Sequence, residues 1–283
     1  MRSKLVLLLD YLSTYDKVTV AFSGGVDSTL LLAAALRSLG RENVLGVIST
    51  SALHPRRETE EAEQLAAALG ARLQRIDPGE LRNEAFLANP PRRCYICKSL
   101  LLTGIRQAAR AWNCTTIVEG SNTDDLKDYR PGLEAVRELD IKSPFLELGF
   151  GKAEIRKLSR QLELPTWNKP AFACLASRIP CRSPISRHRL NRIEQAEDAI
   201  HKLGFRQFRV RDFETTCRIE IDPDDLPRIV EKGVREELIP IFKKIGYKII
   251  TLDLEGYRTG TQNPPMIPDQ ERDATKRSGS FCE

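Results

Sequence analysis

A glycine-rich turn near the start of the chain has the residue types and the spacing of an anion site. The stretch AFSGGVDS spans residues 21–28 and directly follows the apolar run VTV at 18–20. Backbone N–H groups of such a turn can all point at one anion, and a helix that begins there adds the positive end of its dipole. The lysine of a G-x-x-x-x-G-K-[ST] loop is absent, so we expect a phosphate site of another kind. A glycine turn without a ligand is the alternative.

A second polar segment, TTIVEGSNTDDLKDYRPG at 115–132, could complete the same site. Ligands of open α/β sheets gather at the carboxyl ends of the strands, so we expect this segment to meet the glycine turn there. Asp124 and Asp125 could bind Mg²⁺ through oxygen. Gly120 would allow a nucleotide to approach closely, and Arg130 could bind a phosphate or a carboxylate. Asn and Asp in such positions can also simply form turns.

The turn SGGVDS resembles the pyrophosphate loop of the ATP pyrophosphatases. These enzymes cleave ATP between its α and β phosphates and leave an adenylate on the substrate. The resemblance implies that residues of both segments hold the triphosphate and its Mg²⁺. These residues are Ser23, Gly24, Gly25, Asp27, Ser28, Gly120, Asn122, Asp125 and Arg130.

Three cysteines are the other residues suited to chemistry. Cys94 and Cys97 stand three residues apart at a predicted helix start, where the helix dipole and nearby cations should lower thiol pKa values. A four-sulfur zinc site would need a second C-x-x-C pair, which the sequence lacks. Together with Cys174, the pair suggests a cubane [4Fe–4S] cluster with one iron open to sulfide. Zinc bound by these cysteines and His54 or Cys181, a redox pair, and plain structural thiols stay open.

Apolar runs alternate with helical patterns through the first part of the chain. Strand-like runs lie at 18–22, 43–49, 71–77 and 115–120, and helical patterns run from Ser28 to Leu39, from Glu58 and from Cys97. This alternation predicts an α/β domain in which helices cover both faces of a parallel sheet. The resemblance to the ATP pyrophosphatases implies the same PP-loop fold, and we place this domain at 1–166.

The segment 167–187 has no clear period and is rich in proline, so we expect an active-site loop that links two domains. A smaller α+β domain is predicted at 188–262. Its expected elements are a helix at 189–203, strands at 206–212 and 217–221, a helix at 224–245 and a strand at 247–254. We expect the tail at 263–283, rich in proline and charge, to be disordered.

The strand RQFRVRD at 206–212 alternates apolar and basic residues. This pattern places Phe208 and Val210 toward the core. Arg209 and Arg211 then lie on a charged face, for which exposure to solvent is the ordinary interpretation.

Composition places the chain among ordinary globular proteins. Its 283 residues are 41% hydrophobic with a formal net charge of +5, which suits phosphorylated small molecules better than nucleic acid. No run reaches the roughly 18 to 20 apolar residues of a spanning helix, and the N-terminus does not read as a secretion signal. Seven unevenly spaced cysteines favour a reduced cytoplasm.

Four motifs together resemble the LarE-type sulfur transferases over about residues 18–260. They are SGGVDS, GSNTDDLKDYRPG, WNKPAFACLASRIP and TLDLEGYRTG. Enzymes of this family install thiocarboxylates on pyridinium-3,5-biscarboxylic acid mononucleotide, the precursor of the nickel-pincer cofactor of lactate racemase. The resemblance implies adenylation of a carboxylate, a sulfide donor as partner, and assembly into a homo-oligomer, a hexamer.

The family has two chemical branches. In one, a single cysteine gives up its own sulfur and becomes dehydroalanine; that position falls on Ala173 here. In the other, three cysteines hold an iron–sulfur cluster that carries a hydrosulfide, and Cys94, Cys97 and Cys174 match this pattern. We therefore assign the chain to the cluster branch, in which these cysteines and Asp27 are the catalytic residues.

The resemblance also implies residues that bind the substrate phosphate and a metal ion. Those for the phosphate are Ser177, Arg178 and Arg209. Glu197 and Glu220 fall where the family has acidic residues near a metal site, and a further acidic position is Arg228 here.

Three other functions stay open at this stage. A tRNA thiolase of the same superfamily can also use three cysteines around a cluster, although this chain has no strongly basic stretch. An amide-forming ligase of the NAD synthetase kind would use ammonia and need no cysteines. A nucleotide-binding regulator without turnover is the third.

Overall fold

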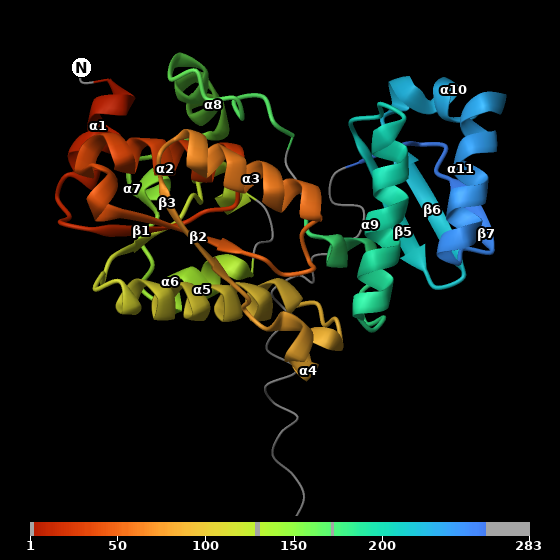
Figure 1. The fold of residues 1–283 in the computed structure, drawn as a ribbon, viewed down its shortest axis with the longest axis horizontal. Coiled ribbons are helices and arrows are strands. Elements are labelled where there is room, and N and C mark those ends of the chain that lie inside the picture. The colour runs from red at the N-terminus through yellow and green to blue at the C-terminus, as the bar shows by residue number, and fades with distance from the viewer. Residues whose placement is uncertain (1–2, 128–130, 171–172, 259–283) are drawn as a thin grey trace, which may run out of the picture.

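The chain forms two domains, each built on its own sheet, in a computed structural model that describes residues 3–127, 131–170 and 173–258 (Figure 1). The larger sheet is parallel, in the order β3-β2-β1-β4. Its strands are β1 (Val18–Ala21), β2 (Val44–Ser49), β3 (Arg72–Ile76) and β4 (Ile117–Val118). The α/β fold expected from the alternating pattern is thus confirmed.

Helices cover both faces of this sheet (Figure 1). One face carries α1 (Lys4–Leu12), α2 (Val26–Leu39), α3 (Arg56–Ala68) and α8 (Lys152–Gln161). The other carries α5 (Arg93–Ala111) and α6 (Gly132–Glu138), and the short helices α4 (Glu84–Leu87) and α7 (Pro144–Glu147) lie in connections. Leu30, Leu31 and Leu32 of α2 are fully buried against the sheet. This burial fixes the start of α2 at the end of β1.

Three helices begin earlier than the sequence pattern predicted. They start at Val26, Arg56 and Arg93, and not at Ser28, Glu58 and Cys97. The first turn of a helix is held by few intrahelical bonds and need not bury apolar side chains, so the periodic pattern does not mark it. As a result, Asp27 and Cys94 lie in the first turns of their helices.

Short turns leave the carboxyl edge of the sheet and carry most of the polar candidates. Five segments of 3-10 helix occur in the described ranges: η1 (Arg41–Asn43), η2 (Glu80–Arg82), η3 (Thr123–Lys127), η4 (Leu175–Arg178) and η5 (Pro223–Asp225). The second and third follow β3 and β4, while the fourth belongs to the segment between the domains. In parallel α/β sheets this edge is where ligands bind.

The smaller sheet has the order β5-β6-β7, with an antiparallel and a parallel pair. Its strands are β5 (Phe208–Phe213), β6 (Thr216–Ile221) and β7 (Ile249–Leu252). Two helices, α9 (Arg187–Lys202) and α11 (Lys232–Ile245), share a buried cluster with it that includes Val210 and Phe242. The single helix predicted at 224–245 is wrong: η5, α10 (Leu226–Ile229) and α11 replace it, because Glu231 takes an extended conformation (φ −57°, ψ 144°).

The charged face of β5 is not exposed, contrary to the sequence expectation. Arg209 and Arg211 are each only 6% exposed. The segment carrying η4 covers this face, and Arg211 Nη1 donates to the carbonyl oxygen of Ser177 at 2.9 Å. Strand alternation could not reveal this, because the covering segment comes from another part of the chain. No helix in the described ranges is long and apolar enough to cross a membrane.

Candidate active site

The glycine turn leads from β1 into α2 in a conformation suited to glycine. Gly24 has φ +69°, and a Cβ atom placed there would lie 2.4 Å from Cβ of Ala62 in α3. The Ser23 N–H donates to Ser28 Oγ at 3.2 Å, and the two hydroxyls are 3.0 Å apart. The N-cap residue Gly25 offers no side-chain cap. The first N–H groups of α2 can therefore serve an anion.

The segment after β4 lies directly against the start of α2, as the sequence predicted for two carboxyl-edge turns. Asn122 Nδ2 donates to Asp27 Oδ1 at 3.3 Å. A Cβ atom on Gly120 would lie 3.1 Å from Asp27 Cβ and 3.2 Å from the Ser28 nitrogen. Gly120 thus allows the first turn of α2 to approach, a role the sequence argument had given to ATP.

Lys152 is a residue of this site that sequence reasoning missed. It opens α8, and its Nζ forms an ion pair with Asp27 Oδ2. Its backbone N–H donates to Asp124 Oδ2 at 2.7 Å. A lysine from α8 thus stands beside the turn that lacks its own lysine. The pattern Gly151-Lys152 before an amphipathic helix was the available sign.

The acidic pair after β4 mainly organises its own segment. Asp124 Oδ1 accepts from Lys127 Nζ at 2.7 Å, and Asp125 Oδ2 accepts from the Asn122 N–H at 2.9 Å. Of the predicted nucleotide residues, Arg130 lies outside the described ranges. The carboxylate beside the start of α2 is therefore that of Asp27.

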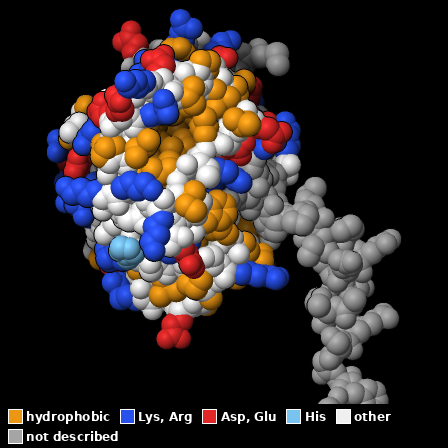
Figure 2. All heavy atoms as spheres, turned by 90° about the vertical axis from the view of Figure 1, so that its right-hand side faces the viewer, with side chains coloured by type: hydrophobic (Ala, Val, Ile, Leu, Met, Phe, Trp, Pro, Cys, Tyr) orange, Lys and Arg blue, Asp and Glu red, His pale blue; other side chains and the backbone are white. Residues whose placement is uncertain are grey.

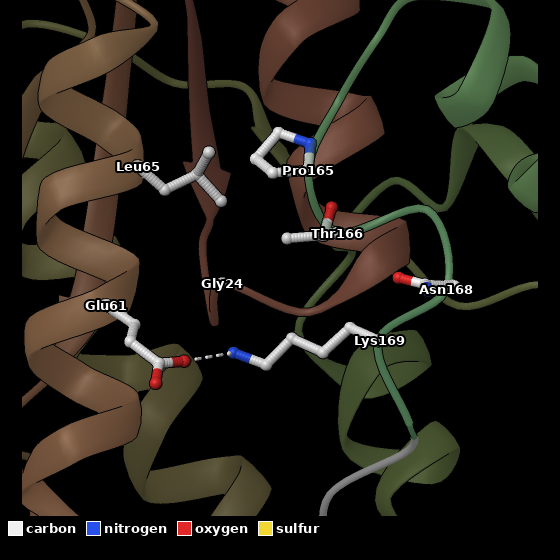
Figure 3. Close-up of a pocket in the computed structure, with 7 residues that line it drawn as sticks. All are labelled: Gly24, Glu61, Leu65, Pro165, Thr166, Asn168 and Lys169. Carbon is white, nitrogen blue, oxygen red and sulfur yellow. Dashed lines mark hydrogen bonds and ion pairs between the residues drawn. The ribbon is translucent and has the colours of Figure 1, made fainter.

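A cavity of about 320 Å³ opens beside Gly24 (Figure 3). Its wall comes from α3 and from the segment after α8: Glu61, Leu65, Pro165, Thr166, Asn168 and Lys169. Lys169 reaches across it and contacts Glu58 at 2.7 Å and Glu61 at 3.1 Å. Burial alone would lower the pKa of Lys169, but these two carboxylates hold it above its usual value. One wall of the cavity, next to the glycine turn, therefore carries charged side chains.

Cys94 and Cys97 lie in the first turns of α5, where the sequence predicted them. Cys97 and Cys174 both pack against one buried apolar cluster, although they come from distant segments. That cluster consists of Leu53, Phe86, Leu175, Ala176, Ile179, Ile185, Leu190 and Ile193. None of the six cysteines in the described ranges forms a disulfide. The structure thus brings Cys97 and Cys174 to one cluster, while the exposed Cys94 lies one turn before Cys97 on α5.

The predicted lowering of thiol pKa values is wrong for Cys97. Burial raises the pKa of this thiol, and negative charge on Cys174, Glu80 and Cys94 raises it further. The helix dipole and the nearby cations can be inferred from the sequence, whereas the depth at which this side chain is buried cannot. Cys174 and Cys94 therefore both lie within electrostatic reach of Cys97.

Glu80 is a second residue that the sequence did not reveal. It is 2% exposed, and Cys97 Sγ lies 3.8 Å from its Oε1. Its Oε2 has no hydrogen-bond partner among the described residues, and burial raises the pKa of this carboxyl. No feature of the run PGELRN indicated that Glu80 would be buried beside a thiol.

The thiol region adjoins the glycine turn through α5. Lys98, next to Cys97 in the chain, pairs with Glu119 at 3.1 Å, and Glu119 precedes Gly120 at the Asp27 contact. Burial raises the pKa of Glu119, but Lys98 and hydrogen bonds from two serines outweigh it and hold the pKa below its usual value. Both candidate centres therefore share the carboxyl edge of the sheet.

Within the described ranges, no three His, Cys, Asp or Glu side chains converge closely enough to hold a metal ion. A tetrahedral zinc site would need its thiolates within about 4 Å of one another, since Zn–S bonds are about 2.3 Å long. The zinc alternative with His54 or Cys181 therefore has no support in this geometry. Cys181 instead lies 3.6 Å from the backbone oxygen of Asn89.

Arg178, which the family resemblance assigns to the substrate phosphate, binds residues of its own chain. Its side chain is fully buried, and its guanidinium binds both carboxylate oxygens of Glu197, at 2.9 and 3.0 Å. Nη1 also donates to the backbone oxygens of Ala173, at 2.5 Å, and Cys174, at 3.0 Å, and to Ser177 Oγ at 3.0 Å. The guanidinium is therefore occupied by internal partners.

Arg209 and Arg211 of β5 add positive charge beside the segment that carries Ser177. Burial lowers the pKa of Arg209, and the charge of Arg178 lowers it further, although Glu197 and Tyr257 act in the opposite direction. The guanidinium of Arg209 lies 4.9 Å from the ring centre of Tyr257. Arg211, which the sequence argument placed in solvent, joins this group. Arg209 and Arg211 thus place two guanidinium groups on the face of β5 that the η4 segment covers.

The carboxylates expected near a metal ion are bound by arginines. Glu197 pairs with Arg178 and also accepts the Val210 N–H at 3.0 Å. Glu220 pairs with Arg211 at 2.7 Å and Arg218 at 2.9 Å. Guanidinium groups thus neutralise both carboxylates.

Comparisons with known proteins agree with this geometry. The sequence profile of the NAD synthase family matches residues 5–87, which contain the glycine turn. An uncharacterized protein of Synechocystis is 38% identical over 93% of this chain and 98% of its own length. The pyridinium-3,5-bisthiocarboxylic acid mononucleotide synthase of Lactiplantibacillus plantarum is 32% identical over 95% of this chain and 97% of its own.

A third relative, an uncharacterized protein of Methanocaldococcus jannaschii, is 32% identical over 86% of this chain and 91% of its own length. These alignments extend through both domains, whereas the NAD synthase match ends before α5. The aligned region therefore includes the cysteines of α5 and η4 and the arginines of β5 as well as the glycine turn. This chain belongs to the family of the LarE-type pyridinium-3,5-bisthiocarboxylic acid mononucleotide synthases.

Proposed function

We propose that this chain uses ATP to adenylate a carboxylate of pyridinium-3,5-biscarboxylic acid mononucleotide and converts it to a thiocarboxylate. The proposal rests on full-length similarity to a synthase of the bisthiocarboxylic product. The structural observation that carries it is the common edge of the phosphate turn and the three thiols, joined by the Lys98–Glu119 pair. Sulfur and activated carboxylate must meet, so the two centres have to be neighbours.

The phosphate turn supports the adenylation half. The first N–H groups of α2 and the Lys152 ammonium can bind the β and γ phosphates. Asp27 would be the main Mg²⁺ ligand, with Asp125 nearby, since carboxylate oxygens suit this ion, which would offset phosphate charge. We propose Ser23, Gly24, Gly25, Ser28, Gly120, Asn122 and Arg130 as the remaining nucleotide residues.

We propose that Cys94, Cys97 and Cys174 hold a [4Fe–4S] cluster. Each cysteine of a cubane binds a different iron, so the thiolates need not converge on a single point as they must around one zinc ion. Cys94 and Cys174 both lie within electrostatic reach of the partly buried Cys97, which fits this requirement. When bound, the cluster supplies an iron without a protein ligand, at which an outside donor can leave hydrosulfide.

We propose that the substrate phosphate binds to Ser177 and the arginines of β5, next to the segment that carries Cys174. Ser177 and Arg209 keep the role that the family resemblance implied. We propose Arg211, which donates to the Ser177 oxygen, in place of Arg178, because Glu197 and the Ala173 and Cys174 oxygens bind the Arg178 guanidinium. A phosphate held there would direct the pyridinium carboxylates toward the sheet edge. Fixed positive charge is well suited to this, because it costs no reorganisation on binding.

The reaction balances in two displacements. An oxygen of the substrate carboxylate attacks the α phosphorus, the bond to the β-phosphate oxygen breaks, and pyrophosphate leaves. A hydrosulfide then adds to the carbonyl carbon, and the bond to the AMP oxygen breaks. The proton of the hydrosulfide passes to solvent or to a base. The N–H groups of α2 and Lys152 offset the charge that develops on the phosphates.

The Asp27→Ala variant tests the adenylation half. We expect pyrophosphate release from ATP and substrate to fall by about 10²- to 10³-fold, because the main phosphate-site carboxylate is lost. Asp16→Ala removes an exposed carboxylate near β1 and should leave the rate unchanged. Unaltered turnover in Asp27→Ala would remove the assignment of ATP to this turn.

The match to NAD synthase makes an amide-forming ligase the second candidate. Such an enzyme would accept ammonia and need no thiols. Full product formation by Cys94→Ser with ammonia, and none with sulfide, would select it.

We further propose that the chain acts as a homo-oligomer, a hexamer, in a reduced compartment such as the cytoplasm. Figure 2 shows hydrophobic side chains gathered on the outer face of the C-terminal domain. Its exposed large apolar residues are Phe213, Val230, Ile239, Ile241, Ile249 and Leu254. Light scattering at several concentrations tests the assembly, and a monomer at every concentration would refute it.

A further inference from the structure

The segment that carries Cys174 is held from two directions. The Leu175 N–H donates to the Leu53 oxygen at 2.8 Å, which fixes the segment to the loop after β2 in the N-terminal domain. On the other side, Arg178 Nη1 donates to the backbone oxygens of Ala173 and Cys174. The Ser177 N–H donates to the same Cys174 oxygen at 2.9 Å. The backbone of Cys174 is therefore fixed on both sides.

Arg178 can do this because Glu197 holds its guanidinium in one orientation. The Nε and Nη2 atoms bind the two oxygens of Glu197, which leaves Nη1 pointing at the Cys174 segment. The pair is buried, with side-chain exposures of 0% and 5%. Bidentate contacts of this kind fix geometry as well as charge, and a lysine cannot reproduce the planar fork.

Glu197 also reaches β5. Its Oε1 accepts the Val210 N–H at 3.0 Å, and Val210 stands between Arg209 and Arg211. One carboxylate thus joins the strand with the proposed phosphate residues to the guanidinium that holds Cys174. The hydrogen bond from Arg211 to the Ser177 oxygen is a second contact between β5 and this segment.

We propose that the Arg178–Glu197 pair is a positioning device that sets the location of the Cys174 sulfur relative to β5. It would act through Cys174 and would not touch substrate. The importance of that sulfur rests on the proposed function, whereas the mechanical role of the pair does not. Its consequence is a fixed distance between the substrate phosphate and the sulfur centre.

The test measures the alkylation of each cysteine in reduced, iron-free protein. A time course with iodoacetamide, followed by peptide mass spectrometry, gives separate rates for Cys94, Cys97 and Cys174. The buried thiols Cys114 and Cys217, which are 3% and 0% exposed, report global unfolding of the two domains. The variants are Arg178→Lys and Glu197→Gln.

Arg192→Lys is the matched control. Arg192 also lies on the buried side of α9, and its Nε binds Asp212 Oδ2 at 3.0 Å. Among the described residues it contacts Asp212 and Tyr247, and not the Cys174 segment. It therefore reproduces the loss of a buried arginine fork without the loss of the proposed positioning contacts.

In Arg178→Lys we expect the alkylation rate of Cys174 to rise about tenfold, because the segment opens locally more often. Rates for Cys94, Cys114 and Cys217 should stay at wild-type values, and Arg192→Lys should change none of them. An unchanged Cys174 rate, or an equal rise in Arg192→Lys, would overturn the proposal.

If Arg178→Lys exposes Cys114 and Cys217 as well, Glu197→Gln decides the question. Glutamine keeps an oxygen for the Val210 N–H but loses the charge that orients Arg178, so Cys174 should react about threefold faster while the buried thiols do not. A wild-type Cys174 rate in this variant would refute the role. A wild-type enzyme that forms no thiocarboxylate would count against the proposed function, and not against these rates.

Discussion

Individual residues in the phosphate turn act through partners that lie far away in the chain. Asp27 is contacted by Asn122 from the segment after β4 and by Lys152 from α8. Three segments thus meet at a single carboxylate, next to the first N–H groups of α2. This arrangement places an ammonium group and a carboxylate where we propose that the triphosphate and its Mg²⁺ bind.

Lys152→Ala should raise the KM for ATP by about tenfold or more, because a charge-assisted contact to phosphate is lost. Lys157→Ala removes an exposed lysine of the same helix and should leave KM unchanged. Steady-state pyrophosphate release at varied ATP measures both. An identical KM in wild type and Lys152→Ala would show that Lys152 serves Asp27 alone.

Elements hold these residues at the sheet edge through close approaches that tolerate few substitutions. The glycine turn touches α3 at Ala62, and the Gly120 turn touches α2. Gly24→Ala should reduce the free energy of unfolding by about 2 kcal/mol, because it forces a positive φ and a steric overlap. Gly25→Ala is a close control, since its φ is negative and its nearest neighbour would be 3.4 Å away.

Urea unfolding of both variants measures the difference. Gly25→Ala should lie within about 0.5 kcal/mol of wild type. Equal losses in the two variants would mean that the contact with α3 does not determine the turn.

The loop after β2 carries a titratable group that should make stability depend on pH. Burial lowers the pKa of His54, although Glu58 partly opposes this. The unfolded chain therefore binds a proton near the ordinary histidine pKa of about 6.5, before the folded chain does, and the stability contributed by neutral His54 is lost as pH falls below that value.

His54→Gln should accordingly lose less stability than wild type between pH 7 and pH 5. His188→Gln, which removes an exposed histidine, should follow the wild-type curve. Urea unfolding at both pH values tests this. A wild-type slope in His54→Gln would show that other groups govern the acid response.

Local patterns predicted the elements well because each strand and helix is encoded by neighbouring residues. The alternation that gave the parallel sheet is of this kind, and so is the glycine turn. The exposure of Arg209 and the acidity of the Cys97 thiol were misjudged because both depend on covering segments distant in sequence. Lys152 and Glu80 were missed for the same reason.

At the scale of the whole molecule, two sheets are joined by a segment that is itself part of a buried cluster. Residues of η4 pack with Leu53 and Phe86 of the N-terminal domain and with Leu190 and Ile193 of α9. The segment is therefore a structural joint that carries Cys174 between the phosphate turn and the arginines of β5. Under the proposed function, this segment would hold the sulfur centre between ATP and the substrate.

We propose that three cysteines hold a cluster and are not consumed. Iron and acid-labile sulfide should be measured in protein purified without oxygen and reconstituted, for wild type, Cys174→Ala and Cys217→Ala. We expect about four irons per chain in wild type and in the Cys217→Ala control, and a loss of most iron in Cys174→Ala. A wild-type chain without iron, or a Cys174→Ala chain that keeps all of it, would contradict cluster binding by these cysteines.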